Sequence, residues 1–410
     1  MTVEYDVVIV GAGIAGGALS RVLARDGLRV LTLERTLQHE DRVRGEFMAP
    51  WGVAEAIRLD VLDVLREAGA HYIRRIIPYS DLVTPEVAEA KAADLGAVLP
   101  GVEGALAVGH PAACDALDAA AVAAGATLIR GVSAVRVSPG PRPEVTYVVD
   151  GVEHVVTPRI VVAADGRESR VRKALGFELH ETTPVVMGAG LLVRDVSGWR
   201  DEDAVIGAAG EWNFLAFPQG QSKARLYLMY EMVHRHKLTG ADKARTFLDA
   251  FRCDAFPGGE AFAAATPAGP CAAFPMNDTW VDDPVGDGVV LIGDAAGWSD
   301  PLIGQGLSVA MRDVRLVRDA LVEGDDWSRD AFSEYVEERT ERMRRLRYTA
   351  RIVARVQCDS GAGAVVRRRT IVQRLESEPR FGLVRAISAL GPEKGPAESF
   401  TEDTMEELLA

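Results

Sequence analysis

The chain has 410 residues, of which 48% are hydrophobic, 26% charged and 6% aromatic, and this composition excludes a disordered or collagen-like protein. A formal net charge of −14 argues against a nucleic-acid-binding protein, because phosphate backbones require surplus Lys and Arg. At about 150 residues per domain, the length predicts two or three domains or one large two-lobed enzyme.

The cysteines and the N-terminus favour a reducing compartment. Cys114, Cys253, Cys271 and Cys358 lie far apart without a C-x-x-C pair, so neither a disulfide framework nor a zinc ribbon is supported. Residues 1–4 lead directly into an apolar run, unlike a signal peptide, and no eighteen apolar residues run uninterrupted. We therefore expect a cytoplasmic protein without a transmembrane segment, and we leave its oligomeric state open.

The first elements form a βαβ unit. An apolar strand at 5–10, a helix at 18–26 and a second strand at 29–33 follow one another, with Gly27 placed to end the helix. Further along, the pattern predicts helices at 51–68 and 115–124, strands at 127–129 and 159–164, and a hairpin of 132–137 with 145–149.

The character changes between residues 183 and 274. Antiparallel strands are predicted at 185–193, 213–217 and 225–230, a helix at 242–251, a buried strand at 289–292, and helices at 308–322 and 329–356. This order predicts an α/β fold in which a Rossmann-type nucleotide domain is interrupted by a mixed-sheet domain. The predicted parts are a discontinuous nucleotide domain of 1–72, 100–180 and 276–330, a substrate-binding sheet domain of 73–99 and 181–275, and a helical region of 331–410.

Glycines follow the first strand at the spacing of a dinucleotide site. Gly11-x-Gly13-x-x-Gly16 allows a sharp turn, close approach of a pyrophosphate and tight packing of helix on strand. The following helix directs unpaired N–H groups at the phosphates. Glu34 ends the second strand, where a carboxylate can accept hydrogen bonds from a ribose. A tight structural turn is the alternative interpretation.

A second motif lies far along the chain. Gly293-Asp294 ends a buried strand, and the segment from Asp300 to Leu307 is rich in glycine and leads into a helix. The positive end of that helix suits the negative charge of a reduced flavin. A nicotinamide dehydrogenase has no need of this element.

At these residues the chain resembles the flavoprotein monooxygenases of the p-hydroxybenzoate hydroxylase fold, the single-component aromatic hydroxylases. Three motifs match in order: the glycine motif with Glu34-Arg35, Asp165-Gly166 with Ser169 and Arg172, and Gly293-Asp294 through Pro301 to Leu307. The resemblance implies a glutathione-reductase-like FAD-binding domain with an inserted substrate sheet and C-terminal helices.

The resemblance also implies a set of residues for non-covalently bound FAD. Asp294 would contact the ribityl–pyrophosphate part, the loop from Gly304 to Leu307 would approach the isoalloxazine, and Asp165-Gly166 would serve both FAD and a passing NAD(P)H. A turn residue is the alternative for Asp165. The full expected set is Gly11, Gly13, Ile14, Ala15, Gly16, Glu34, Arg35, Arg44, Val135, Asp165, Gly166, Gly293, Asp294, Pro301, Gly304, Gly306 and Leu307.

Two positions depart from the family pattern. Where relatives often carry an arginine or glutamine before the helix at 115, this chain has His110, which either substitutes near the flavin or is an ordinary surface or capping histidine. Where many relatives place a histidine after the Gly-Asp motif, this chain has Gly297-Trp298, and Trp298 could line the substrate pocket.

The resemblance implies an NAD(P)H- and O₂-dependent monooxygenase of secondary metabolism. It would hydroxylate or epoxidise a small aromatic or polyketide-like molecule through a flavin C4a-hydroperoxide, with chemistry that the flavin rather than a catalytic side chain or metal supplies. A reductase similar to geranylgeranyl reductase is an alternative, because it shares the glycine and Gly-Asp motifs. A flavin-dependent halogenase is a weaker alternative, since residues 212–218 lack Trp-x-Trp-x-Ile-Pro, and a non-enzymatic flavin-binding protein is another.

The substrate should lie on the central sheet. One face of the strand at 212–218 carries Trp212, Phe214 and Ala216, and Tyr227 and Met229 alternate similarly on the next strand. A ligand pocket and ordinary core packing both fit this pattern. Arg347, Arg351 and Arg355 form a basic stripe that is either a solvated helix face or a dock for an anion. His234 and His236 are interpreted as part of a polar loop and not as a metal site.

Overall fold

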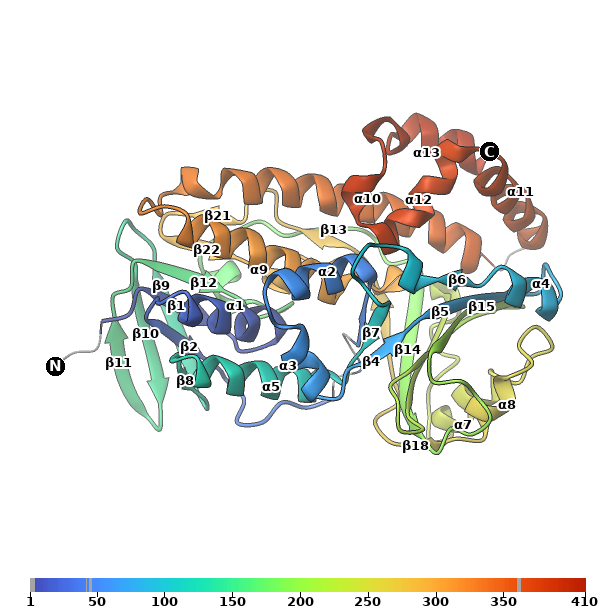
Figure 1. Ribbon diagram of the computed structural model, residues 1–410, viewed down its shortest axis with the longest axis horizontal. Coiled ribbons are helices and arrows are strands. Elements are labelled where there is room, and N and C mark those ends of the chain that lie inside the picture. The colour runs from blue at the N-terminus through green and yellow to red at the C-terminus, as the bar shows by residue number, and fades with distance from the viewer. Residues whose placement is uncertain (1–3, 42, 44–45, 360–362) are drawn as a thin grey trace.

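The computed structural model describes residues 4–41, 43, 46–359 and 363–410. Figure 1 shows two sheets side by side, one associated with the N-terminal helices and one on the opposite side, with the C-terminal helices above the second. The predicted α/β architecture is confirmed.

The first sheet has six strands in the order β21-β22-β12-β1-β2-β8. All neighbours run parallel except β21, which is antiparallel to β22. Every residue of the three central strands is buried, as in parallel sheets that are covered on both faces. The strands are β1 (Val7–Val10), β2 (Val30–Leu33), β8 (Thr127–Ile129), β12 (Ile160–Ala163), β21 (Val285–Gly286) and β22 (Val289–Leu291).

Successive residues of β1 contribute to two different cores. Val7 and Ile9 pack in a cluster formed with several helices, whereas Val8 and Val10 pack in the cluster formed with a small antiparallel sheet. Among the helices are α1 (Ile14–Arg25), α5 (His110–Ala123) and α9 (Gly306–Val322). The small sheet consists of β9 (Ala134–Ser138), β10 (Glu144–Val149) and β11 (Val152–Val156). The predicted hairpin is therefore confirmed, and β11 extends it by a strand that the pattern did not reveal.

The second sheet has eight strands in the order β18-β14-β17-β16-β15-β5-β6, with β19 also paired to β14. Its strands are β5 (Arg75–Ser80), β6 (Ala93–Asp94), β14 (Val186–Arg194), β15 (Asp203–Ala209), β16 (Trp212–Pro218), β17 (Ala224–Glu231), β18 (Thr266–Pro267) and β19 (Ala272–Met276). The helices α4 (Pro85–Ala90), α7 (Lys243–Asp249) and α8 (Gly259–Ala263) contribute residues to the aromatic-rich core on one face of this sheet. The sequence did not predict β15, which contains several small residues and is held by partners on both edges, β5 and β16.

Two smaller sheets lie beside these. One joins β3 (Phe47–Met48), β7 (Ala105–Ala107) and β4 (His71–Ile73), and the other joins β13 (His180–Glu181) and β20 (Thr279–Trp280). Through β4 and β5, which follow each other closely in sequence, the chain passes from the first small sheet into the eight-stranded sheet.

The prediction of a single helix at 51–68 is wrong. The structure has two helices, α2 (Pro50–Arg58) and α3 (Leu62–Glu67). Between them Asp60 adopts a left-handed conformation with φ of 55°, and the N–H of Val61 donates to the carbonyl of Ala56. This is a helix-ending motif, and Asp tolerates the left-handed region better than most residues.

The start predicted for the helix at 115–124 is also wrong. Helix α5 begins five residues earlier, at His110, with Pro111 in its first turn, where the missing N–H of proline costs no intrahelical hydrogen bond. The helix therefore carries His110 at its N-terminus, next to the cavity described below.

The C-terminal helices cover one end of the molecule (Figure 1). They are α10 (Ser333–Gln357), α11 (Ala364–Ser377), α12 (Pro379–Leu390) and α13 (Glu402–Leu409), and they share a core that includes Tyr348, Ile371 and Phe400. Among the described helices, none is both long and apolar enough to cross a membrane.

Candidate functional site

One cavity connects the first sheet, the second sheet and the C-terminal helices. Its volume is about 1130 Å³, which slightly exceeds the usual size of a small-molecule pocket, about 300–1,000 Å³. Most predicted site residues line its wall: Gly11, Gly13, Ile14, Ala15, Glu34, Arg35, Val135, Asp165, Gly166, Gly293, Asp294, Pro301, Gly304, Gly306, Leu307, Tyr227, Met229 and Trp298. Gly16 lies behind this wall, and Arg44 lies outside the described residues.

The three glycines of the first motif have different roles. A Cβ atom on Gly11 would lie 2.5 Å from the carbonyl oxygen of Ala164, and one on Gly16 would collide with the carbonyl oxygen of Gly11. The Cβ position of Gly13 has no described atom within 4 Å. Gly11 and Gly16 are therefore needed for packing, whereas Gly13 leaves bare backbone at the cavity, beside the N-terminus of α1.

Glu34 supports this turn with its carboxylate. The N–H of Ala12 donates to Oε2 at 2.8 Å and the N–H of Thr36 donates to Oε1 at 2.8 Å. Burial alone would raise the pKa of Glu34, but these hydrogen bonds outweigh it and hold the pKa below its ordinary value. The carboxylate is thus an ionised acceptor on the wall of the cavity.

Asp165 caps a short helix. Its carboxylate accepts from the hydroxyl of Ser169 at 2.5 Å and from the N–H of Arg170 at 2.7 Å, at the start of α6 (Arg170–Ala174). Asp165 therefore stabilises a turn, as its alternative interpretation has it, and it also lines the cavity. Arg172, which is buried, donates to the carbonyl of Ala295 at 2.9 Å and so joins this segment to the Gly293-Asp294 turn.

The Gly293-Asp294 turn rests on a buried ionic cluster that the sequence analysis missed. The N–H of Gly293 donates to Asp313 Oδ2 at 2.8 Å, and Arg339 donates to the same oxygen at 3.1 Å and to the carbonyl of Gly297 at 2.9 Å. Arg342 donates to the other oxygen of Asp313 at 2.7 Å. The available signal was a charged pair, Arg312-Asp313, inside an otherwise apolar stretch of α9.

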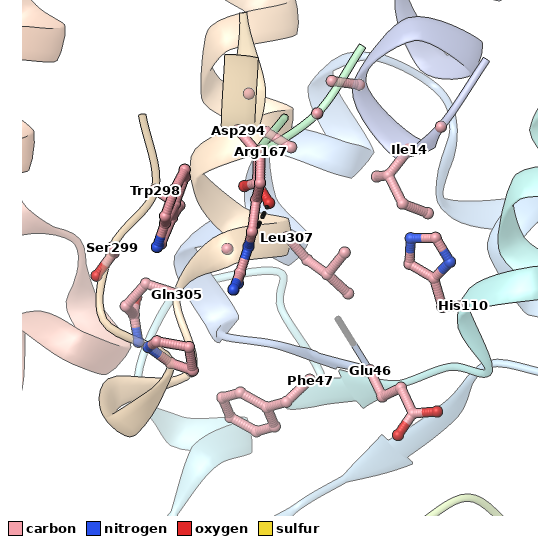
Figure 2. A pocket seen from close by; sticks show the side chains of 18 of the residues that line it. Ile14, Glu46, Phe47, His110, Arg167, Asp294, Trp298, Ser299, Gln305 and Leu307 are labelled. Atoms are coloured by element: carbon pink, nitrogen blue, oxygen red, sulfur yellow. Dashed lines mark hydrogen bonds and ion pairs between the residues drawn. The ribbon is translucent and has the colours of Figure 1, made fainter. Parts of the chain in front are cut away.

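Arg167 is a second residue that the sequence analysis missed. Its Nε donates to Asp294 Oδ2 at 3.1 Å, and its guanidinium carbon lies 5.1 Å from the ring centre of Trp298. Figure 2 shows the Arg167 side chain reaching into the cavity between Trp298 and Leu307. A cation therefore lies beside the loop that the resemblance assigns to the isoalloxazine.

The loop before α9 is held in shape from both sides. Asp300 accepts from the N–H of Leu302 at 2.9 Å, and Gly304 adopts a φ of 62° against the ring of Phe47. Gln305 accepts from the indole N–H of Trp51 at 2.8 Å and donates to the carbonyl of Ile303 at 2.6 Å. The first residues of α9, Gly306 and Leu307, thereby face the cavity.

His110 lines the cavity and lies opposite Ile14 in Figure 2. The position agrees with a side chain near the cofactor, and because His110 is the first residue of α5 it agrees equally with a histidine at a helix N-terminus. Its ring Nδ1 lies 3.7 Å from the sulfur of Cys114.

The substrate face predicted for β16 is wrong. Trp212, Phe214 and Ala216 point away from the cavity into the aromatic core, where the rings of Phe214 and Phe256 stack with centres 5.4 Å apart. Leu215 and Phe217, on the opposite face, line the cavity together with Tyr227 and Met229. Alternation along a strand defines two faces but does not reveal which one the helices cover.

A buried ion cluster borders the cavity where the two sheets meet. Arg225 is fully buried and donates to Asp41 Oδ2 at 2.7 Å and to both carboxylate oxygens of Glu46. Burial raises the pKa of Glu46 above its ordinary value, although Arg225 opposes the shift. The cluster ties the segment after β2 to strand β17.

The basic stripe of α10 is divided. The guanidinium of Arg347 lies 4.0 Å from the ring centre of Trp280, and Arg351 pairs with Glu402 at 2.6 Å. Arg351 and Arg355 are exposed, whereas Arg347 is half-buried. His234 and His236 belong to a short turn after β17, and no group of metal-ligating side chains was found among the described residues.

The sequence matches a known protein family. Residues 4–349 match the profile of the FAD binding domain family. Among curated proteins, squalene monooxygenase SE1 of Panax ginseng is 43% identical over 76 residues, 18% of this chain and 14% of that protein. The squalene monooxygenase of Mus musculus is 39% identical over 74 residues, 18% of this chain and 13% of that protein. The match thus spans about one seventh of the length of these relatives.

Solved structures with the same fold cover nearly the whole chain. A p-nitrophenol 4-monooxygenase from Pseudomonas putida has a TM-score of 0.76 at 16% identity, over 95% of this chain and 97% of that one. A flavin-dependent brominase has a TM-score of 0.73 at 19% identity, over 99% of each chain. An anhydrotetracycline hydroxylase from Streptomyces rimosus has a TM-score of 0.71 at 20% identity, over 95% of this chain and 76% of that one. At these identities the similarity establishes the fold, which is that of p-hydroxybenzoate hydroxylase.

Proposed function

The chain belongs to the FAD binding domain family, and from this membership we propose that it is an FAD-dependent monooxygenase that uses NAD(P)H and O₂ to hydroxylate or epoxidise a small organic substrate. The observation that carries the proposal is that one cavity is lined both by the FAD motif residues and by an apolar sheet face. A substrate on that face would be next to the cofactor.

The residues at the first sheet suit FAD. Bare backbone at Gly13 and the N-terminus of α1 would hold the pyrophosphate, and the ionised Glu34 would accept from a ribose hydroxyl. Asp294 would contact the ribityl chain, and the N–H groups at Gly306 and Leu307 would meet the electron-rich edge of the ring system. The bound flavin supplies the redox chemistry that activates O₂.

The protein would orient the substrate and exclude water. Leu215, Phe217, Tyr227 and Met229 form an apolar wall beside the loop that carries Pro301 and Gly304. An apolar enclosure keeps bulk water away from reactive oxygen species and positions a flat or extended substrate. We further propose that NAD(P)H binds only transiently, because the chain has no second complete glycine motif.

The test is substrate-dependent oxygen incorporation. The purified protein should be yellow, and neutral aromatic, polycyclic and polyene compounds should be screened for stimulated oxidation of NADH or NADPH with uptake of O₂. Mass spectrometry after reaction under ¹⁸O₂ should find one labelled oxygen in the product. Double-bond reduction without O₂ would instead favour a reductase, and a product that requires added bromide or chloride would favour a halogenase.

A further inference from the structure

The cavity has two ends of different chemistry. The cofactor end is lined by the three FAD motifs and contains charged side chains such as Glu34, Asp165, Arg167 and Asp294. The far compartment is the part lined by the cavity-facing side of β16 and β17 and by helices α10, α11 and α12. FAD motifs are absent from its described lining, so this volume remains for another molecule.

Among the residues that the structure describes, those that line the far compartment carry no charged side chain. Its described side chains are apolar or, as in Tyr227, Gln357 and Ser388, polar but uncharged. At its border Glu46 is neutralised by the fully buried Arg225. A charged group on a ligand would therefore lose its hydration here without gaining a partner among the described residues.

Helix α12 contributes to the wall of the far compartment, and we call this part the end wall. Gly382, Ala386 and Ala389 line the cavity at positions i, i+4 and i+7, so they share one face of the helix. Leu375 of α11 and Val353 of α10 continue the same wall. The described lining residues of α12 are therefore all small, and a larger side chain at Ala386 or Ala389 would reduce the volume of the cavity.

We propose that the far compartment binds the apolar tail of an uncharged, elongated molecule and that Ala386 and Ala389 set the greatest tail length. That this molecule is a substrate rests on the proposed function, whereas its binding in the far compartment does not. The C-terminal helices are then the part of the chain that selects ligands by length.

The test is a binding series that requires no turnover. FAD-loaded full-length protein is titrated with 4-alkylphenols from ethyl to octyl, followed by flavin absorbance and calorimetry. Affinity should rise about fourfold per methylene, as expected for complete burial of each group. Matching phenols whose alkyl tail ends in a carboxylate place a charge in the far compartment and should bind at least tenfold more weakly. Affinity that does not change with tail length, or equal binding of the carboxylate-ended compounds, would overturn the proposal.

Two cavity variants and one control test the end wall. Ala386→Phe should leave binding of 4-ethylphenol within twofold of the parent but weaken binding of 4-octylphenol at least tenfold. Ala389→Leu adds less volume and should act in the same direction if Ala386→Phe does not fold. Ala397→Phe places the same ring at an exposed position outside the cavity and should change neither affinity. Equal effects of Ala386→Phe and Ala397→Phe on the octyl compound would refute the role of α12.

The two proposals fail in different ways. Length-dependent binding without incorporation of ¹⁸O into any substrate would disprove the monooxygenase function and leave the far compartment as an apolar ligand site. Oxygenation of charged, short substrates with no length dependence would do the reverse.

Discussion

Nε of Arg167 lies 3.1 Å from Oδ2 of Asp294, so the carboxylate of the Gly-Asp motif is held by an arginine from the Asp165-Gly166 segment. The two residues are 127 positions apart in the chain, and both line the cavity. The pair joins two FAD motifs directly and gives each residue a separate, testable role.

Asp294→Ala should weaken FAD binding. Loss of a charge-assisted hydrogen bond costs about 1.5–3 kcal/mol, which corresponds to roughly a ten- to hundredfold loss of affinity. Titration of apo-protein with FAD measures the change. Asp325→Ala, at an exposed position away from the cavity, is the control. Parent-like affinity in Asp294→Ala would show that the Gly-Asp assignment is wrong.

Arg167→Ala should lower the reduction potential of the bound flavin. A cation near the ring system stabilises the anionic reduced form more than the neutral oxidised form, and about 1.4 kcal/mol corresponds to about 30 mV for a two-electron couple. Spectroelectrochemistry measures the midpoint. Arg167→Lys retains the charge and should recover most of the shift. An unchanged potential in Arg167→Ala would mean that the guanidinium lies too far from the flavin.

Asp313→Asn should destabilise the whole fold. The carboxylate is fully buried and accepts from Gly293, Arg339 and Arg342, and removing one partner of a buried ion cluster costs about 3–5 kcal/mol. Urea unfolding measures the loss. Asp319→Asn is a matched control on the same helix, because its partly exposed ion pairs should be worth less than about 1 kcal/mol. Similar losses in both variants would contradict this account.

Adjacent residues of β16 should affect different properties. Phe214→Ala removes a ring from the aromatic core and should cost about 3–5 kcal/mol of stability, with little change in ligand binding. Leu215→Ala should instead weaken binding of a neutral apolar ligand such as 4-octylphenol, because its side chain lines the cavity. Thermal unfolding and titration of both variants distinguish the faces. The opposite pattern would restore the face first expected from the sequence.

The contribution of Asp278 and Asp300 to stability should fall as the pH rises from about 4 to 7. Burial and the nearby Asp300 raise the pKa of Asp278 to about 7, against the opposing effect of Arg347, and burial raises the pKa of Asp300 to about 6. The unfolded carboxyls have pKa values near 3.9, so the folded state holds more protons in this window and loses stability as they dissociate.

Asp278→Asn should flatten that pH dependence. The amide retains an oxygen that can accept from the N–H of Asp300, a bond of 2.8 Å in the parent, but it cannot ionise. From a shift of about three pKa units, the gain at pH 8 over the parent should be roughly 2–4 kcal/mol. Unfolding at pH 5 and pH 8 measures it. An equal pH dependence in both proteins would mean that other groups cause it.

The sequence was sufficient to predict those elements whose conformation depends mainly on residues close together in the chain. The buried strands before Gly11 and Gly293 are short apolar runs ended by glycine. The Gly11-x-Gly13-x-x-Gly16 spacing predicts a tight turn followed by a helix, and both are formed by residues adjacent in sequence. Most of the residues that the sequence analysis assigned to FAD lie along one cavity, and each motif brings its own backbone geometry to its wall.

Tertiary packing decided the rest. Side chains alternate between the two faces of β16, and both faces are apolar. The sequence therefore could not show that helices carrying phenylalanines cover Phe214 and that Leu215 faces the cavity. Several contacts at the site join segments that are distant in sequence. Examples are Arg167 with Asp294, Arg339 with Asp313, and the placement of α12 beside β16 and β17 in the lining of one cavity. Such contacts depend on how sheets and helices pack in space, and no local pattern records that packing.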